Sequence, residues 1–253
     1  MKRILLFLLL LTAINATAQN LVKNPSFEVY EDCPIFFSEV YPPTSASPGV
    51  QDWYRATGGS SDYYNACSPS VGTVNVPNAF MYQEARDGEA FLGQYSPNWN
   101  SSYHEYIEGN LIGPLAAGHR IYVSFWIVMA WASAEGWDAG TENVGAHFSD
   151  DYIYEPSLFC LDVVPQVVSP VGYVFTDTAN WEQISGTFTA VGGEEWVTIG
   201  NFAPDDAGDD YSMNYHFVDD VCVLDIDGPV GTGAMYDTFT CSGRPVTLSA
   251  QYL

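Results

Sequence analysis

Two adjacent acids, Asp219 and Asp220, interrupt an apolar run near the end of the chain, YHFVDDVCV. The alternation of a β-strand puts apolar side chains on both of its faces, with Tyr215, Phe217, Val221 and Val223 on one and Val218 and Cys222 on the other. Neighbouring strand residues point to opposite faces, so at least one of the two carboxylates must face the packed side. A buried carboxylate needs a hydrogen-bond donor or a metal ion as its partner.

Calcium is the natural candidate for that partner, because Lys and Arg together number only 7 in the chain. Near the start, the stretch Asn24–Glu28 (NPSFE) offers a third acid, Glu28, beside a turn rich in carbonyl oxygens. We therefore predict a structural calcium at Glu28, Asp219 and Asp220. The alternative is that the two aspartates end a strand beside solvent.

Aromatic side chains in polar loops are the candidates for ligand binding, because sugar rings stack their C–H faces on exposed Trp and Tyr while polar neighbours take the hydroxyl groups. Two loops qualify, SPNWNSSYHEY and WASAEGWDAG. The predicted glycan-binding residues are Trp99, Tyr103, Trp131 and Trp137, with Tyr95 as a second aromatic face and Arg86 as a donor to hydroxyls. Packing of these rings against long loops is the alternative, since protein surfaces expose some aromatics without function.

The remaining tryptophans of interest lie in strand-like apolar settings and are predicted to belong to the core: Trp53, Trp126, Trp181 and Trp196. The binding hypothesis therefore depends on loop aromatics sharing one exposed face. A purely structural or adhesive segment predicts that they do not.

Catalytic motifs are missing from the sequence. His104-Glu105 resembles the start of a zinc-protease HExxH motif, but Glu108 stands where the second histidine is required. The chain has no nucleophile elbow, Walker loop or dinucleotide fingerprint. Paired acids such as Glu105 with Glu108 are expected by chance among 31 Asp and Glu, so a glycoside hydrolase is the less favoured alternative to a non-catalytic module.

The first 18 residues read as a secretion signal, with a charged start at Lys2 and Arg3, an apolar stretch from Ile4 to Leu11, and an A-x-A cleavage site at Ala16–Ala18. The mature chain is predicted to begin at Gln19 and to be secreted or displayed at the cell surface. We expect one domain over 19–226, then a linker and the start of a further module over 227–253. No later run approaches the ~18 apolar residues that a membrane-spanning helix requires.

The net charge excludes two classes of partner. The chain has 7 Lys and Arg against 31 Asp and Glu, and removal of the signal takes away two of the seven cations. Such an acidic surface repels nucleic acid and anionic lipid. An extracellular polysaccharide or another cell-surface component is the expected partner.

Five cysteines in an exported chain suggest disulfides. Cys33 and Cys67 flank a Pro- and Ser-rich irregular segment that a disulfide would stabilise, and we predict that they are bonded. Cys160 and Cys222 are candidates for a second bridge, although free buried cysteines are also common.

Short β-branched and aromatic runs separated by Gly, Pro, Asn and Asp predict strands throughout the chain. The main ones are Ala90–Gln94, Ile121–Met129, Val144–Phe148, Gln183–Ala190, Trp196–Phe202 and Tyr215–Leu224. Helix is expected only as a turn or two within Tyr103–Leu111. About 235 mature residues of this pattern predict an all-β fold, an antiparallel β-sandwich of the jelly-roll type.

Several stretches, in this order and spacing, resemble a family of secreted Bacteroidetes surface proteins. They are NLVKNPSFEVYEDCP at the mature start, Asp52-Trp53, SSDYYNAC, Tyr103–Ile127, Asn180–Phe202 and FVDDVCV. The N-terminal domain of that family is similar to the galactose-binding-like jelly rolls of carbohydrate-binding modules. The resemblance covers about Asn20 to Leu224, and it implies a structural calcium at Glu28 with Asp219 or Asp220.

The tail extends this resemblance. Asp237–Ala250 looks like the opening of the Ig-like modules that follow such domains, and we expect that module to be incomplete here. The resemblance and the residues together predict a secreted, non-catalytic module that binds carbohydrate or another extracellular surface and contains calcium.

Overall fold

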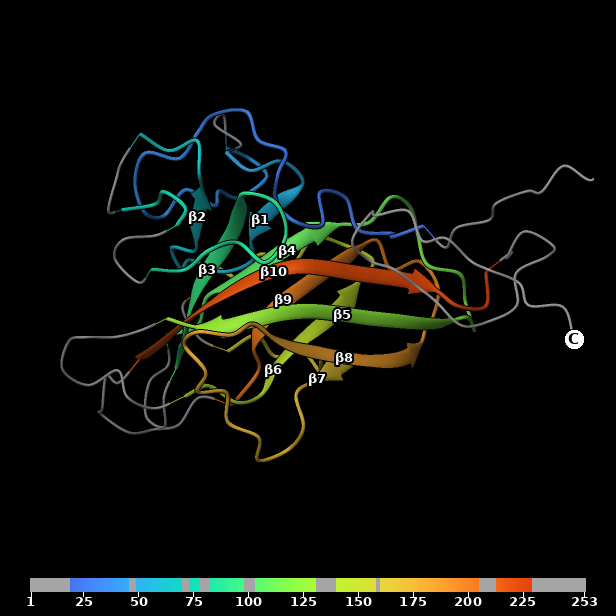
Figure 1. The fold of residues 1–253 in the computed structure, drawn as a ribbon. Helices are drawn as coiled ribbons and strands as arrows, with labels where there is room; N and C mark the ends of the chain where they lie inside the picture. The colour runs from blue at the N-terminus through green and yellow to red at the C-terminus, as the bar shows by residue number, and fades with distance from the viewer. Residues whose placement is uncertain are drawn as a thin grey trace, which may run out of the picture.

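The protein is a sandwich of two antiparallel sheets, seen as two layers in Figure 1. The computed structural model describes residues 19–45, 49–69, 73–77, 82–97, 103–130, 140–157, 160–204 and 213–228. The first sheet has the order β1 (Trp53–Arg55), β4 (Tyr106–Asn110), β9 (Trp196–Asn201), β6 (Val144–Ser149) and β7 (Val167–Val168). The second sheet has the order β2 (Asp62–Asn65), β3 (Ala90–Pro97), β10 (Met213–Asp225), β5 (Arg120–Met129) and β8 (Glu182–Thr189). This arrangement confirms the predicted all-β, jelly-roll-type sandwich.

Six strands lie where the β-branched and aromatic runs predict them: β3, β5, β6, β8, β9 and β10. The helical turn predicted within Tyr103–Leu111 is wrong, because β4 occupies Tyr106–Asn110. β4 pairs with β1 on one side and with β9 on the other, so its backbone N–H and C=O groups are used across the sheet. This pairing overrides the weak local pattern.

Apolar side chains fill the space between the sheets, and a second apolar cluster covers the outer face of the second sheet. Along β5, Phe125 and Ile127 belong to the main core. Val128, which points the other way, belongs to the outer cluster together with Phe91 and Phe217. Side chains from loops, such as Phe37 and Ala85, pack onto this outer cluster.

The side chains of β10 switch from one face of the sheet to the other at Asp219 and Asp220. The pairing of β10 with β5 shifts between Asp219 and Cys222, and Asp220 has a left-handed backbone with φ of 51°. This β-bulge inserts one residue and reverses the alternation beyond it. The prediction that Tyr215 and Phe217 share a face with Val221 and Val223 is therefore wrong. The two aromatics join the outer cluster, and the two valines join the main core.

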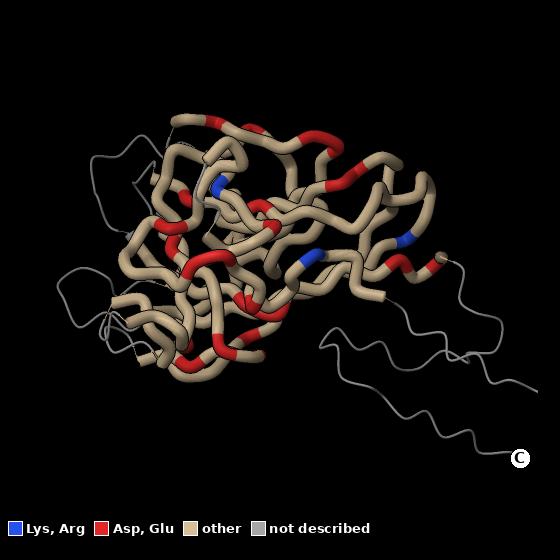
Figure 2. The backbone as a smooth tube through the Cα atoms, turned by 90° about the horizontal axis from the view of Figure 1, so that it is seen from above, with Lys and Arg blue, Asp and Glu red and all other residues tan. Residues whose placement is uncertain are grey.

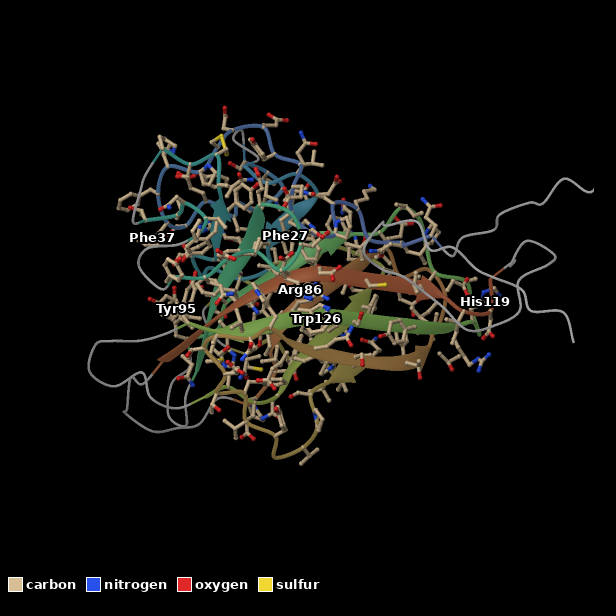
Figure 3. All side chains as sticks on the ribbon, in the orientation of Figure 1. Phe27, Phe37, Arg86, Tyr95, His119 and Trp126 are labelled. Carbon is tan, nitrogen blue, oxygen red and sulfur yellow. A yellow bond between two sulfur atoms is a disulfide. The ribbon has the colours of Figure 1, made fainter. Side chains whose placement is uncertain are left out.

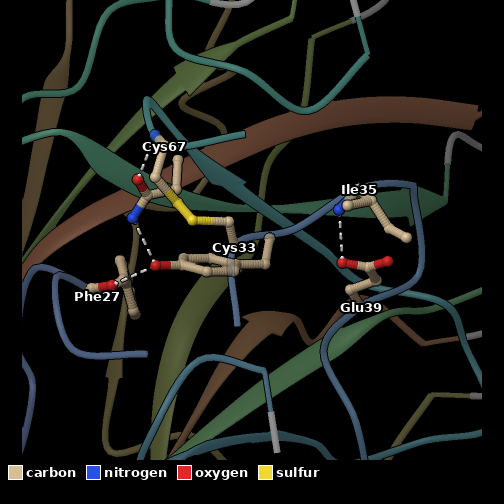
Figure 4. Close-up of a disulfide and its surroundings, with 7 residues drawn as sticks. Phe27, Cys33, Ile35, Glu39 and Cys67 are labelled. Carbon is tan, nitrogen blue, oxygen red and sulfur yellow. Dashed lines mark hydrogen bonds between the residues drawn. A yellow bond between two sulfur atoms is a disulfide. The ribbon is translucent and has the colours of Figure 1, made fainter. Parts of the chain in front are cut away.

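Cys33 and Cys67 form the predicted disulfide, with their Cα atoms 5.7 Å apart (Figure 4). The bridge ties the loop after the N-terminal segment to the end of β2, where Asn65 Oδ1 accepts from the Cys67 N–H at 2.8 Å. The candidate second bridge between Cys160 and Cys222 is not formed. Cys222 is itself disulfide-bonded, whereas Cys160 keeps a thiol beside the Tyr106 hydroxyl at 3.5 Å.

The ends of the described domain are held by hydrogen bonds. Leu21 N donates to Val223 O at 2.8 Å, which ties the N-terminal segment of the described domain to β10. Asp227, predicted to lie in a linker, accepts from the Arg120 guanidinium at 2.7 Å. The predicted signal and the tail from 229 onward lie outside the described residues. Among the described residues, no helix has the length and apolar character needed to cross a membrane.

Candidate functional site

Of the predicted glycan-binding residues, Trp99, Trp131 and Trp137 lie outside the described residues. Tyr95 and Tyr103 are described, and both are partly buried beside Glu105. The Tyr103 hydroxyl donates to Glu105 Oε1 at 2.9 Å, and the Tyr95 N–H donates to Oε2 at 2.8 Å. The Tyr95 ring packs edge-on against Tyr215, with ring centres 4.8 Å apart. The structure thus places these two tyrosines in a packed network rather than on an open face.

Asp62 and Tyr215 lie in the same buried network. Asp62 accepts from the Tyr215 hydroxyl and, at 2.5 Å, from the Ser38 N–H. The Tyr215 hydroxyl also lies 3.1 Å from that of Tyr64. Burial raises the pKa of Asp62 to about 7, although the hydrogen bonds from Tyr215 and Ser38 oppose that rise. The carboxyl oxygens of Asp62 are therefore used to join β2 to β10 and to the loop at Ser38.

The paired acids Glu105 and Glu108 are also occupied by internal donors. Glu105 accepts from the Ser60 N–H at 2.6 Å in addition to the two tyrosine residues. Glu108 is fully buried and accepts from the Ile153 N–H, which lies 3.1 and 3.2 Å from its two oxygens. Burial raises the pKa of Glu108 to about 8. Both acids thus hold segments of the sandwich together, and neither was assigned this role from the sequence.

Asp219 and Asp220 are both buried, as the strand pattern predicts for at least one of them. Asp219 Oδ2 accepts from the N–H groups of Arg86 and Asp87 at 2.8 and 3.0 Å, and Oδ1 accepts from the Asp220 N–H at 2.6 Å. Glu28 Oε1 accepts from the N–H groups that follow, those of Glu89 and Ala90, both at 2.8 Å. These carboxylates therefore fix the loop that leads into β3.

A calcium ion fits these residues only in part. The oxygens of Asp219 already accept N–H groups, and Asp220 Oδ2 lies 3.7 Å from the Arg86 guanidinium. Asp220 Oδ1 is buried and has no hydrogen-bond partner, which is the feature that a cation would satisfy. Within the described ranges, however, no three His, Cys, Asp or Glu side chains are arranged so that they could hold a metal ion.

A groove of about 310 Å³ lies along β8, the edge strand of the second sheet. Its aromatic lining comes from Trp126 on β5, Trp181 before β8, and Tyr173 and Phe175 from the segment between β7 and β8. Its polar lining comes from Glu182 and Gln183 on β8, and Pro170 completes it. Trp126 and Gln183 are directly paired across β5 and β8, so the floor of the groove is the sheet itself.

Arg86, predicted as a ligand residue, lies beside this groove. Its guanidinium stacks on the Trp126 ring, with Cζ 3.9 Å from the ring centre, and Figure 3 shows the two side chains together on the face of β10 and β5. Asp219 holds the Arg86 backbone and Asp220 pairs with its guanidinium. The acid cluster thus positions the cation that packs against the groove.

The lining of the groove is itself ordered by hydrogen bonds. The Tyr173 hydroxyl donates to Glu182 Oε2, and the Trp181 indole N–H donates to Glu84 O at 3.2 Å. Tyr173 stays 45% exposed, and Trp126 and Trp181 are only partly buried. Trp53 is fully buried in the main core as predicted, and Trp181 packs against the outer cluster. Trp126 is a member of neither cluster, so its prediction as a core residue is wrong.

One signal in the sequence points to the groove. Phe125 and Ile127 alternate with Ser124 and Trp126, so Trp126 must lie on the face opposite the main core. The apolar composition of the run concealed this alternation. Tyr173 and Phe175 carry no comparable signal, since they come from an irregular segment that only the tertiary fold brings to β8.

No family model matches the chain, and no curated protein matches it. Among solved structures it is similar to a Stig cyclase, Fisc, from Fischerella sp. TAU, with 14% identity, 82% of this chain and 97% of that chain covered, and a TM-score of 0.49. It is also similar to the CBM22-1–GH10 modules of Clostridium thermocellum xylanase 10B, with 11% identity, 89% and 30% covered, and a TM-score of 0.41. A third likeness is to the K3 adhesin domain of Lys-gingipain from Porphyromonas gingivalis, with 13% identity, 69% and 92% covered, and a TM-score of 0.34. These likenesses are distant, so the chemistry of the groove has to indicate the function.

Proposed function

We propose that the protein is a secreted, non-catalytic β-sandwich module that binds carbohydrate in the groove at Trp126 and Trp181. The observation that carries this proposal is the concentration of four aromatic side chains around one small groove, next to the polar groups of Glu182 and Gln183. Aromatic faces suit the C–H faces of sugar rings, and a few placed polar groups suit the hydroxyls. The disulfide between Cys33 and Cys67 is in keeping with an oxidising, extracellular setting.

An adhesive role toward another protein is the second candidate. The segment that supplies Tyr173 also exposes Val171 and Val174, which are 99% and 45% exposed. Exposed apolar side chains that gather in one segment are typical of surfaces that contact other proteins. The resemblance to secreted Bacteroidetes surface proteins is compatible with either role.

A glycan-array screen of the mature chain from Gln19, followed by calorimetry on the best ligand, tests carbohydrate binding. Trp126→Ala or Trp181→Ala is expected to weaken binding about 10–100-fold, because loss of a central aromatic contact costs about 1.4–2.8 kcal/mol. Trp196→Ala is the matched control, because that ring packs against Tyr54 and Tyr152 on the first sheet, away from the groove. If the folded protein binds no glycan on a broad array, the carbohydrate proposal is rejected in favour of the adhesive one.

Calcium at Glu28, Asp219 and Asp220 belongs to the same proposal, supported by the unpaired Asp220 Oδ1. A calcium concentration ten times the Kd contributes about 1.4 kcal/mol of stability. Excess chelator is therefore expected to lower the melting temperature by about 3–6 °C for a domain of this size. Asp220→Asn should remove most of that difference. An unchanged melting temperature would leave these acids with the loop-fixing role alone.

A further inference from the structure

The charge inside the groove has one sign. Among the described residues that line it, Glu182 is the only charged one, and its carboxylate stands at the groove wall with the Tyr173 hydroxyl donating to it. Gln183 beside it is neutral. A ligand that enters the groove therefore meets a carboxylate with no cation of the lining to balance it.

The aromatic walls favour a positive charge as well. The face of an aromatic ring is electron-rich and attracts a cation within about 6 Å of its centre. Trp126 already holds a guanidinium in this way, at 3.9 Å from its ring centre. That guanidinium is itself paired with Asp220 Oδ2 at 3.7 Å.

The rest of the protein carries an excess of negative charge, which attracts cations to its surface. The chain carries a formal charge of −24, and Asp and Glu are spread over the body of the domain in Figure 2 while Lys and Arg are few. Such a field raises the local concentration of cations and repels anions, most strongly at low ionic strength. Local and overall charge thus point to the same class of ligand.

We propose that the groove prefers sugars that carry a free, protonated amine, such as glucosamine units, over the matching neutral sugars, and that it rejects uronic acids. This inference rests on the proposed carbohydrate binding at the same groove. The ammonium group would pair with Glu182 and lie against Trp181, because the Arg86 guanidinium already stacks on the Trp126 ring. The volume of about 310 Å³ is at the lower end of the roughly 300–1,000 Å³ typical of ligand pockets, which suits one or two sugar rings.

Calorimetric titration at about pH 6, where a sugar amine is protonated, tests the preference with four disaccharides. They are the β-1,4-linked dimers of glucosamine, N-acetylglucosamine and glucose, and a digalacturonate. We expect the glucosamine dimer to bind about 5–20-fold more tightly than its N-acetylated counterpart, a difference of about 1–1.8 kcal/mol for one charge-assisted contact. The digalacturonate is expected to bind most weakly, and the preference should shrink as salt is raised.

Glu182→Gln is expected to bring the constants of the amine and the N-acetyl dimers within about twofold of each other. The matched control is Glu195→Gln, which removes one exposed carboxylate just before β9 on the first sheet and should keep the preference. Equal binding of the two dimers by the unmodified protein, or a preference that survives Glu182→Gln, would overturn the amine inference and leave carbohydrate binding intact. No binding of any of the four by folded protein would overturn both.

Discussion

Replacement of Asp219 by alanine is expected to lower the free energy of unfolding by about 3–5 kcal/mol. The side chain is fully buried and accepts three backbone N–H groups, those of Arg86, Asp87 and Asp220. Alanine would leave these donors without a partner and would release the loop that precedes β3. Urea unfolding followed by tryptophan fluorescence measures the loss.

Asp177→Ala is the matched control for that substitution. Asp177 also accepts backbone N–H groups, those of Ala179 and Asn180 at 2.8 Å, but it does so in an exposed turn where water replaces the lost acceptor. We expect the control to cost less than about 1 kcal/mol. Equal and small losses for the two variants would show that the buried cluster at Asp219 contributes no more than a surface turn.

Glu108→Gln is expected to stabilise the protein at alkaline pH and to have almost no effect at acid pH. Burial raises the pKa of Glu108 from 4.5 to about 8. The folded state therefore keeps this proton while the unfolded state loses it, so the contribution of Glu108 to stability falls as pH rises from about 4.5 to about 8. Glutamine never ionises, so the variant should be the more stable form by about 2–4 kcal/mol near pH 8 and nearly equal to the wild type near pH 4.5.

The difference in unfolding free energy between wild type and Glu108→Gln separates the effect of Glu108 from that of the other buried titratable groups. Asp62, with a pKa of about 7, changes stability in the same direction, whereas His216 acts in the opposite one. Burial lowers the pKa of His216 to about 3, so its contribution is lost as pH falls below about 6.5. Unfolding curves at several pH values measure the difference, with Glu195→Gln as the same substitution at an exposed position. If the free energy of unfolding changes with pH in the same way in Glu108→Gln and in wild type, Glu108 is not the source of the stability lost at alkaline pH.

Most of the strand architecture could be predicted from the sequence. The alternation of β-branched and aromatic residues marks the long strands, and these signals are local because a strand needs one face against the core. Local signals were too weak for β4, whose position depends on partners from β1 and β9 that lie far away in the chain. The disulfide between Cys33 and Cys67 was predictable because the two cysteines flank a Pro- and Ser-rich irregular segment that a bridge stabilises.

Much less of the candidate site could be predicted from the sequence. Asp219 and Asp220 were recognised as acids that must be buried, but their partners, the N–H groups of the loop at Arg86, come from more than a hundred residues away. Tyr95 and Tyr103 were selected as exposed aromatics, and hydrogen bonds to Glu105 instead hold them in a packed network. Arg86 was selected as a donor to ligands, and the structure adds the ring on which it stacks.

The sequence by itself determined the all-β class, the acidic charge and the burial of a carboxylate in the last strand. These follow from composition, from period-two alternation and from the cost of leaving a buried charge without a partner. Only the tertiary structure decided which aromatic side chains meet. A one-residue bulge at Asp220 turns the rest of β10 over, and the segment between β7 and β8 brings Tyr173 and Phe175 against Trp126. Contacts of this kind depend on strand register and loop path, which long-range pairing sets and which no local pattern encodes.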